Sequence, residues 1–337
     1  MTHIIITEDQ AKLGMEGHRL VVDIPGLGTS QYPGETIDSL SLFGSFTLSS
    51  TLVKQCLKRG VDVFIYSGSG AYFGRLTNAE NVSVAKQRRQ VEMSGSVPFR
   101  LGLAKQIVRA KVTNQLALLQ AYDSGRILQE SDLQGLRHAL TWVDSGSTVN
   151  EVIGLEGNAA RSYFSCLGRL APREFSFRGR SRRPPTDAFN SMLSLGYSML
   201  YRNVIGAIER HGLSPYFGFL HADRENHASL ASDLMEEWRA VIVDDTVMSL
   251  VNDGDLVPAM FVRDKSNNSV TLDRDAIRVF MKALREKMLT TEAYIPLDER
   301  MYTFQSALDA QIDQLIVALE SGDPKRYRPV VTEETPW

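Results

Sequence analysis

The chain has little cysteine and no long hydrophobic run. Only Cys56 and Cys166 occur among its 337 residues, far apart and outside any CxxC spacing. A zinc finger or a dithiol redox motif therefore has no support, and two free thiols in a reducing cytoplasm are the simplest account. No stretch approaches the roughly 18 consecutive apolar residues of a membrane-spanning helix, and residues 1–8 do not read as a signal peptide, so we expect no membrane association.

Two catalytic motifs are also missing. The sequence contains no GxxxxGK[ST] phosphate-binding loop, and residues 67–70 (SGSG) lack both the lysine and the following helix of such a loop. The serines have no His and Asp in a suggestive arrangement nearby. ATP-driven chemistry and serine hydrolysis are therefore poorly supported.

The composition is that of an ordinary globular protein, with 43% hydrophobic and 23% charged residues in a chain long enough for two domains. A net charge of −3 argues against a protein that is basic throughout. Residues 169–183 are nevertheless dense in arginine, with Glu174 as the single carboxylate; the arginines are Arg169, Arg173, Arg178, Arg180, Arg182 and Arg183. Such a cluster favours a face that binds polyanions, and a solvated arginine-rich loop without a partner is the alternative.

The hydrophobic pattern changes from strands to helices along the chain. Residues 18–24, 37–46, 61–66 and 72–76 read as strands, and a short helix at 50–58 ends at Gly60. Helical periodicity covers 99–122, 130–143, 149–170, 188–210, 229–250, 274–289 and 301–319. We predict an α+β protein with a small β-rich domain at 1–80, a linker or connecting helix at 81–95, a larger all-α catalytic domain at 96–322 and a mobile tail at 323–337.

Acidic residues gather on the helix predicted at 229–250. Asp233 and Glu236 are three residues apart and therefore neighbours on one side of this helix, while His221 precedes it on a short apolar stretch. Neighbouring carboxylates repel unless a cation lies between them, and a histidine before a carboxylate-bearing helix suits a mixed nitrogen and oxygen metal site. The alternative is a solvated helix surface on which Arg239 pairs with Glu236.

A second acidic position lies in the helix predicted at 149–170. Glu156 stands near Gly154 and next to Gly157, and glycines weaken a helix, so their presence suggests a spot where another element approaches closely. Taken alone, this is a weak indication of function.

Several segments together carry a family resemblance. GLEGNAAR at 154–161, RPPTDAFNSMLSLGYSMLY at 183–201, GFLH at 218–221 and SLASDLMEEWR at 229–239 follow one another in the order of a known family, and SLFG at 41–44, LSS at 48–50 and GVDVFIY at 60–66 are similar to its β domain. The chain resembles the first-numbered family of CRISPR-associated (Cas) proteins, the integrase and endonuclease that forms the catalytic subunit of spacer acquisition. The resemblance covers nearly the whole chain.

The resemblance implies roles for individual residues. Glu156, His221 and Glu236 would bind the metal, and Asp233 would be an adjacent acidic residue that helps to position the metal or water. Glu236 stands where some members have Asp, which changes the reach by one methylene. The remaining roles are phosphate contact for Arg161 and a supporting role for Asn190 and Tyr201.

The implied reaction joins the 3′-hydroxyl ends of short DNA fragments to the CRISPR array by transesterification with Mg²⁺ or Mn²⁺, metals that suit carboxylate and imidazole ligands. The implied partners are double-stranded DNA, a second copy paired through the β domain, and a small ferredoxin-like adaptation protein. Two alternatives stay open: a stand-alone nuclease acting on branched DNA, and a non-catalytic DNA-binding scaffold.

Overall fold

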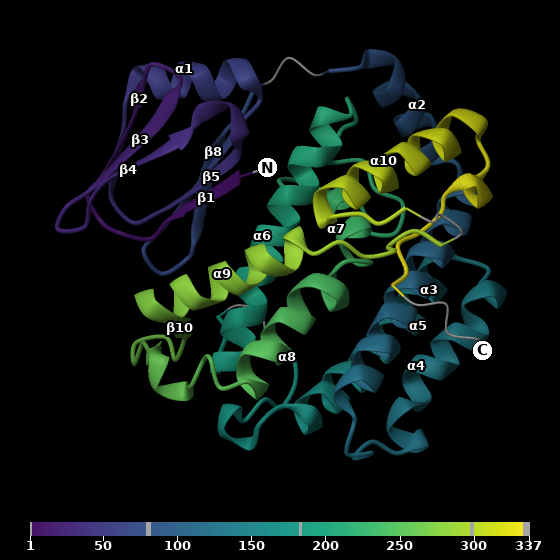
Figure 1. Cartoon of the computed structure of the whole chain (residues 1–337). Helices are drawn as coiled ribbons and strands as arrows, with labels where there is room; N and C mark the ends of the chain where they lie inside the picture. Colours follow the sequence, from purple (N-terminus) through teal and green to yellow (C-terminus); the bar gives the residue numbers. More distant parts are fainter. Residues whose placement is uncertain (1, 79–81, 182–183, 297–299, 333–337) are drawn as a thin grey trace.

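The computed structural model describes residues 2–78, 82–181, 184–296 and 300–332. A β-rich part at the N-terminus is followed by a larger helical part (Figure 1), which confirms the predicted α+β class. Within the described ranges, no helix is both long and apolar enough to cross a membrane.

The β-rich part contains two four-stranded sheets that share a core. One has the order β1 (Thr2–Ile6), β5 (Ile37–Phe43), β7 (Asp62–Tyr66) and β8 (Tyr72–Leu76); the other has the order β4 (Gly28–Pro33), β3 (Arg19–Ile24), β2 (Ala11–Glu16) and β6 (Phe46–Leu48). β5 lies parallel to both β1 and β7. Apolar residues from both sheets and from α1 (Ser50–Arg59) form one buried cluster, so the two sheets fold as a unit.

The predicted turn chemistry explains where these elements end. Ser49 caps α1 by accepting a hydrogen bond from the Leu52 N–H, and Gly60 ends it with a left-handed φ of 68°. The strand predicted at 37–46 is interrupted because Gly44 has a φ of +73°, and a Cβ there would collide with the Asp9 carboxylate. The stretch therefore forms two strands in different sheets.

The helical part is built around two buried helices, α3 and α6. Its helices are α2 (Val84–Gly95), α3 (Val97–Tyr122), α4 (Glu130–Trp142), α5 (Val149–Leu170), α6 (Ala188–Arg210), α7 (Ser229–Met235), α8 (Asp245–Asn252), α9 (Arg274–Leu289) and α10 (Phe304–Ser321). α3 and α6 bury residues on every side, as expected of helices at the centre of a helical core. Between α8 and α9 the chain also forms a small hairpin, β9 (Phe261–Arg263) and β10 (Val270–Leu272), which the pattern did not predict.

The helix predicted at 229–250 is not continuous. α7 ends at Met235, a π-helical turn spans Arg239–Asp244, and α8 follows at once. Such turns change the direction in which successive side chains point and are frequent at functional sites. Glu236 and Glu237 lie between α7 and this turn and face different neighbours.

Two connecting segments pack more tightly than their polar composition suggests. The region predicted as a linker or connecting helix forms α2, and its buried Gln90 donates hydrogen bonds to the carbonyls of Ser214 (2.7 Å) and Phe217 (2.9 Å). The prediction of a mobile tail is wrong for residues 324–332, because Tyr327 and Val330 are buried in the helical core. Residues 333–337 lie outside the described residues.

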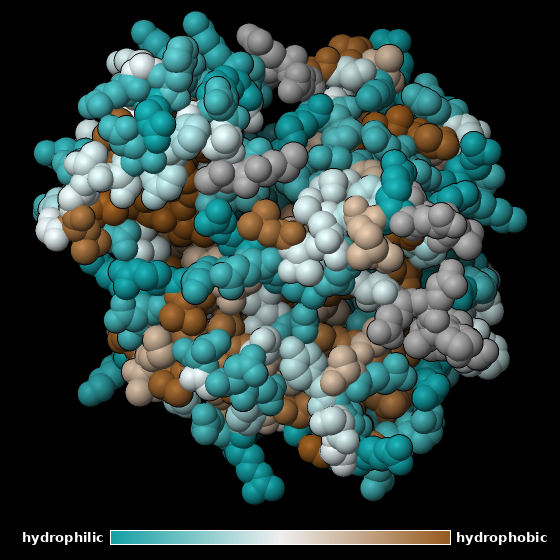
Figure 2. Space-filling view, viewed as in Figure 1, coloured by the Kyte–Doolittle hydropathy of each residue, from teal (hydrophilic) through white to brown (hydrophobic). Residues whose placement is uncertain are grey.

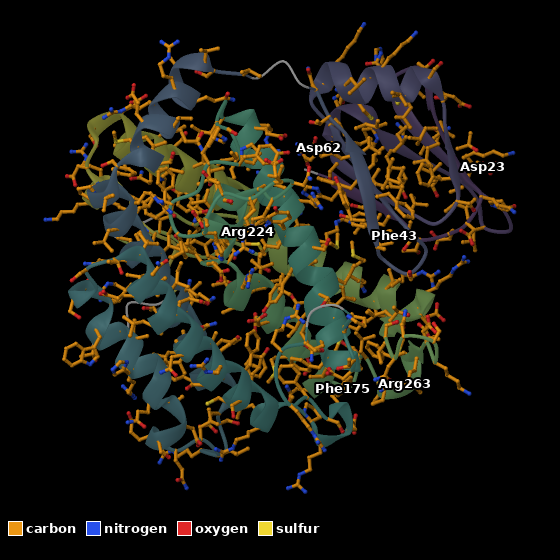
Figure 3. The ribbon with its side chains drawn as sticks, turned by 180° about the vertical axis from the view of Figure 1, so that it is seen from behind. Asp23, Phe43, Asp62, Phe175, Arg224 and Arg263 are labelled. Carbon is orange, nitrogen blue, oxygen red and sulfur yellow. The ribbon has the colours of Figure 1, made fainter. Side chains whose placement is uncertain are left out.

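Ion pairs join the two parts. Arg75 of β8 pairs with Glu209 of α6, and Arg278 of α9 lies 3.0 Å from Glu8. Asp62 stands where the β-rich part meets α6 (Figure 3), 3.8 Å from Arg210. The β-rich part is therefore attached to the helical part by charged contacts as well as through residues 77–83.

Candidate active site

Glu156 lies on α5 and turns toward the centre of the helical part. Its carboxylate meets the ammonium group of Lys111 on α3, and its side chain is 23% exposed, so it borders solvent. A Cβ at Gly154 or Gly157 would meet nothing within 4 Å, so the prediction that these glycines mark a close approach is wrong.

Lys111 joins Glu156 to Glu236. It comes from the middle of α3, where its side chain is 5% exposed, and its Nζ lies 2.6 Å from Glu236 Oε2. A buried lysine stays charged only with carboxylate partners, and the two glutamates raise the pKa of Lys111 although burial opposes this. The sequence pattern did not single out this residue.

Glu236 is buried beside two cations. Its Oε1 lies 3.2 Å from Arg239 Nη2, and its Oε2 faces Lys111. Burial alone raises the pKa of this carboxyl, but Arg239, Lys111 and His221 together outweigh burial and hold the pKa well below its usual range. Glu236 is therefore ionised at neutral pH. The sequence suggests the pairing with Arg239 as a surface contact, whereas in the structure it is buried.

Asp233 orients His221. The carboxylate is fully buried and accepts hydrogen bonds from the backbone N–H groups of Phe219 (2.5 Å), Leu220 (2.9 Å) and His221 (2.9 Å). The same carboxylate lies 2.8 Å from His221 Nδ1, which directs the other ring nitrogen, Nε2, outward. With its oxygens occupied in this way, Asp233 is a positioning residue.

Gly218 allows this loop to approach α7. A Cβ at this position would lie 2.8 Å from Ser229 Cβ and 2.9 Å from Asp233 Oδ2, so a larger residue would push the histidine loop away.

Burial lowers the pKa of His221, but the hydrogen bond and charge of Asp233, with the charge of Glu236, outweigh burial and raise it. Arg224 lies in the loop between His221 and α7 (Figure 3).

The donor set fits a divalent cation in chemistry but is not gathered into a closed ligand shell. Glu236 Oε2 is buried and lies 2.6 Å from Lys111 Nζ, the carboxylate of Glu156 meets the same ammonium, and the charge of Glu236 acts on the His221 imidazole. In the part of the chain that the structure describes, no three His, Cys, Asp or Glu side chains form a metal-binding group. The ammonium of Lys111 instead stands between Glu156 and Glu236.

Arg239 packs on a buried group of polar side chains. Its guanidinium lies 4.9 Å from the centre of the Tyr197 ring, and the hydroxyls of Tyr197 and Tyr163 each donate a 2.6 Å hydrogen bond to Asp244. Burial raises the pKa of Asp244 to about 6, although both tyrosines oppose the rise. Asp244 is therefore bound into the core through its tyrosine partners.

The two supporting residues hold backbone. Asn190 accepts hydrogen bonds from the Arg180 side chain and the Ser181 N–H, and donates to the Gly179 carbonyl, so it shapes the loop before α6. The Tyr201 hydroxyl accepts a 2.9 Å hydrogen bond from the N–H of Ala228 at the start of α7. Their supporting role in the reaction stays a prediction.

The predicted arginine face divides into two groups. Arg161, Arg173 and Arg178 are exposed and remain candidates for phosphate contact. Arg169 pairs with Asp132 and donates to the Ile127 carbonyl, and Arg180 donates to Asn190 and Ser194, so both serve internal contacts. Arg182 and Arg183 lie outside the described residues.

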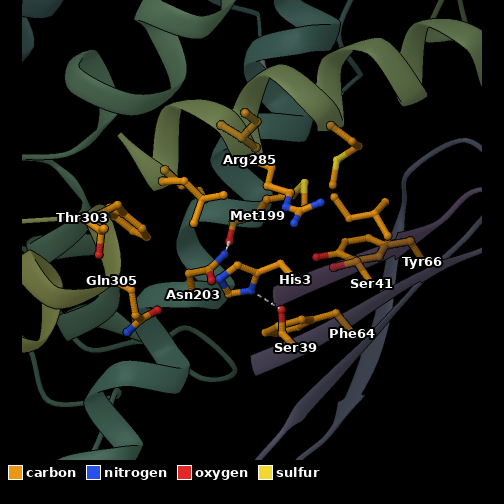
Figure 4. Close-up of a pocket in the computed structure, with 16 residues that line it drawn as sticks. His3, Ser39, Ser41, Phe64, Tyr66, Met199, Asn203, Arg285, Thr303 and Gln305 are labelled. Atoms are coloured by element: carbon orange, nitrogen blue, oxygen red, sulfur yellow. Dashed lines mark hydrogen bonds between the residues drawn. The ribbon is translucent and has the colours of Figure 1, made fainter. Parts of the chain in front are cut away.

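A cavity of about 240 Å³ lies elsewhere, between β1, β5 and β7 on one side and α6, α9 and α10 on the other (Figure 4). It is lined mainly by apolar side chains, with His3 and Arg285 among the polar ones, and hydrophobic surface is visible on this face of the β-rich part (Figure 2). None of its lining residues belongs to the site of Glu156, His221 and Glu236.

Comparison with known proteins points to one family. A family model described as CRISPR associated protein Cas1 matches residues 4–286. The protein named CRISPR-associated endonuclease Cas1 from Mycobacterium tuberculosis is 43% identical over 97% of this chain and 96% of its own length. CRISPR-associated endonuclease Cas1 3 from Thermus thermophilus is 31% identical, with 97% and 96% covered.

Solved structures show the same fold. A chain of a Cas6-RT-Cas1–Cas2 complex matches with a TM-score of 0.82 and 25% identity over 99% of this chain, which spans 36% of that longer chain. A casposase bound to integration product matches with a TM-score of 0.84 and 24% identity, covering 96% of this chain and 92% of the other. Because the family model matches most of the sequence and the mycobacterial relative aligns along nearly its full length, this chain belongs to the Cas1 family of CRISPR-associated proteins.

Proposed function

We propose that this chain is a metal-dependent DNA integrase and endonuclease of CRISPR adaptation, which joins the 3′-hydroxyl ends of short DNA fragments to the CRISPR array. The observation that carries the proposal is the convergence of Glu156 and Glu236 on the ammonium of Lys111, with the charge of Glu236 also acting on His221. The endonuclease name of the mycobacterial and Thermus relatives supports DNA cleavage.

In the proposed reaction, the 3′-hydroxyl oxygen of the fragment attacks a phosphodiester of the array. A new P–O bond forms, the bond to the strand's own 3′ oxygen breaks, and that oxygen receives a proton. One phosphodiester replaces another, so no ATP is needed. Hydrolysis of the same bond, with water as the nucleophile, would be the nuclease reaction.

The chain's own residues would prepare the site for this reaction. Glu156, Glu236 and His221 Nε2 would hold Mg²⁺ or Mn²⁺, which when bound stabilises charge on the phosphoryl oxygens and activates the attacking oxygen. Asp233 keeps the imidazole oriented, and Arg239 keeps Glu236 ionised and in place. The exposed Arg161, Arg173 and Arg178 would bind backbone phosphates without reading bases.

We also propose the cellular setting. The complex named for a neighbouring solved chain contains Cas1 and Cas2, which supports a small, ferredoxin-like adaptation protein as partner in the prokaryotic cytoplasm. A homodimer paired through the β-rich part completes the proposed assembly. Light scattering of the purified chain, with and without this partner, tests both stoichiometries.

A joining assay tests the activity. The protein is incubated with a short duplex bearing 3′-hydroxyls, a supercoiled array plasmid and Mn²⁺ or Mg²⁺, with and without the partner. We expect metal-dependent covalent joining that is lost in Glu156→Ala and His221→Ala. Plasmid cleavage without joining would favour the stand-alone nuclease, and DNA binding with neither reaction would favour the scaffold.

A further inference from the structure

Lys111 occupies a position that the proposed reaction leaves unexplained. It lies in the middle of α3, the helix that buries residues on every side, and its ammonium group reaches both Glu156 and Glu236. A lysine is among the residues least often buried, because its charge must then be compensated by partners. Here the partners are the two carboxylates that we assign to the metal.

Each oxygen of Glu236 faces its own cation. Oε2 is buried and lies 2.6 Å from Lys111 Nζ. The other oxygen, Oε1, is held separately by Arg239. A different cation could therefore replace the ammonium beside Oε2 while Arg239 keeps the carboxylate in place.

The local charges oppose a bound metal as long as the lysine stays. Two carboxylates, Glu156 and Glu236, already face two cations, Lys111 and Arg239. A divalent ion added to this group would be repelled by an ammonium at a distance of a few ångströms, in surroundings where charges are weakly screened. Without the lysine, the carboxylates would face Arg239 and His221.

We infer that Lys111 is a built-in counter-ion that takes the place of the divalent cation between Glu156 and Glu236, so that metal binding must displace it and the lysine sets the metal affinity. The inference rests on the metal dependence of the proposed function and deepens it. Before the metal arrives, Lys111 keeps the two carboxylates together and prevents their mutual repulsion. Lys111 is therefore a positioning residue, and its charge lowers the affinity of the site for the metal.

Calorimetric titration of the purified chain with Mn²⁺ tests this inference directly. We expect Lys111→Met to bind Mn²⁺ at least about tenfold more tightly than the unaltered chain, because the competing charge is gone. Without metal, the melting temperature of the variant should fall, since the carboxylates then repel each other. With saturating Mn²⁺, its melting temperature should rise more than that of the unaltered chain.

Lys287 provides a matched control. It also bridges two carboxylates, with Nζ 2.9 Å from Asp245 and 3.0 Å from Glu292, but it lies on α9 outside the site. Lys287→Met should lower the melting temperature and leave the Mn²⁺ affinity within about threefold of the unaltered value. A tenfold gain in this control as well would mean that the effect is not specific to Lys111, and the inference would fail.

Two further variants separate the possible outcomes. Lys111→Arg keeps the charge and should not tighten Mn²⁺ binding, whereas Lys111→Gln should tighten it and replaces Lys111→Met if that variant does not fold. Unchanged or weaker binding in the neutral variants overturns the role of Lys111 while leaving the proposed function intact. Glu236→Gln should abolish Mn²⁺ binding. If the unaltered chain binds no Mn²⁺, or if Glu236→Gln binds it equally well, the metal dependence of the proposed function fails too.

Discussion

Glu236 and Glu237 are adjacent in sequence and both are buried, yet their surroundings differ in charge. Glu236 faces the candidate site, where Lys111 and Arg239 keep its pKa low. Glu237 faces the C-terminal segment, where its neighbours are the neutral groups of Tyr327, Gln311 and Val330. Burial raises the pKa of Glu237 to about 8, although these hydrogen bonds oppose the rise.

The difference shows that burial alone does not decide the state of a carboxyl group. Cations within contact distance keep Glu236 ionised and available to a ligand, whereas neutral donors bind Glu237 into the core. Consecutive residues on a helical backbone point about 100° apart, so the two side chains reach different neighbours. We therefore assign Glu236 to the proposed reaction and Glu237 to packing.

The largest expected effect comes from removing the charge of Glu236, the glutamate that lies between two cations. Glu236→Gln keeps the shape of the side chain but removes the charge, and we expect joining and cleavage to fall by at least about 10³-fold. A plasmid assay followed on gels measures the rates. Glu237→Gln is the control and should retain activity within about threefold. A Glu236→Gln chain with more than a tenth of the original activity would contradict the assignment.

The next largest effect comes from truncating Glu237, the glutamate that is surrounded by neutral hydrogen-bond donors. Glu237→Ala leaves the Tyr327 hydroxyl, the Val330 N–H and the Gln311 amide without their acceptor, which should lower the free energy of unfolding by about 3 kcal/mol. Urea unfolding measures the loss, and hydrogen exchange at residues 327–332 should increase. Glu237→Gln should lose less, because its amide oxygen still accepts. A loss below about 0.5 kcal/mol would show that this segment is not held through Glu237.

Asp244 sharpens the comparison with a third buried carboxyl group. Its pKa is about 6 in the folded chain and near 4 when unfolded, so protonation favours folding: its contribution to stability is present below pH 4 and is lost as the pH rises through 6. Relative to Asp244→Asn, the free energy of unfolding of the unaltered chain should therefore fall by on the order of 2 kcal/mol between pH 4 and pH 7. Urea unfolding of both chains across this range measures the difference. A pH-independent difference would contradict the assignment.

The smallest effect extends the comparison to the arginines. The exposed Arg178 should bind phosphate, so Arg178→Ala should weaken duplex binding by roughly threefold to fivefold and reduce the salt dependence by about one charge. Arg169 is tied to Asp132, so Arg169→Ala should leave DNA affinity unchanged and lower stability by about 1 kcal/mol. Fluorescence anisotropy at several salt concentrations, with urea unfolding, distinguishes them. Equal losses of DNA affinity in Arg178→Ala and Arg169→Ala would contradict the division into phosphate-binding and internally paired arginines.

The sequence predicted most of the helices because apolar periodicity and end signals agree there. The helix at 149–170, for example, matches α5 and begins after the cap Thr148. The break between α7 and α8 was missed, because a π-helical turn is set by contacts with distant elements rather than by local preference. The burial of Tyr327 was missed for the same reason, since its partner Glu237 is 90 residues away.

Within the site, the sequence indicated Glu156, His221, Asp233 and Glu236 but not how they meet. The backbone hydrogen bonds of Asp233 depend on the loop at Gly218, and no pattern reveals such a contact. Lys111 left no distinct signal, because the same helix also carries Arg100, Lys105 and Arg109. Only the packing of α3 shows that Lys111 is the buried one among these charges.

The hydrogen bonds of the C-terminal segment also bear on how the chain folds. Asn114 of α3 donates to the carbonyl of Val330, 216 residues later, and the Val330 N–H donates to Glu237, 93 residues earlier. Contacts of such high sequence separation slow folding, because a long loop must close before they form. During synthesis, these hydrogen bonds can therefore form only after residues 327–332 have been made.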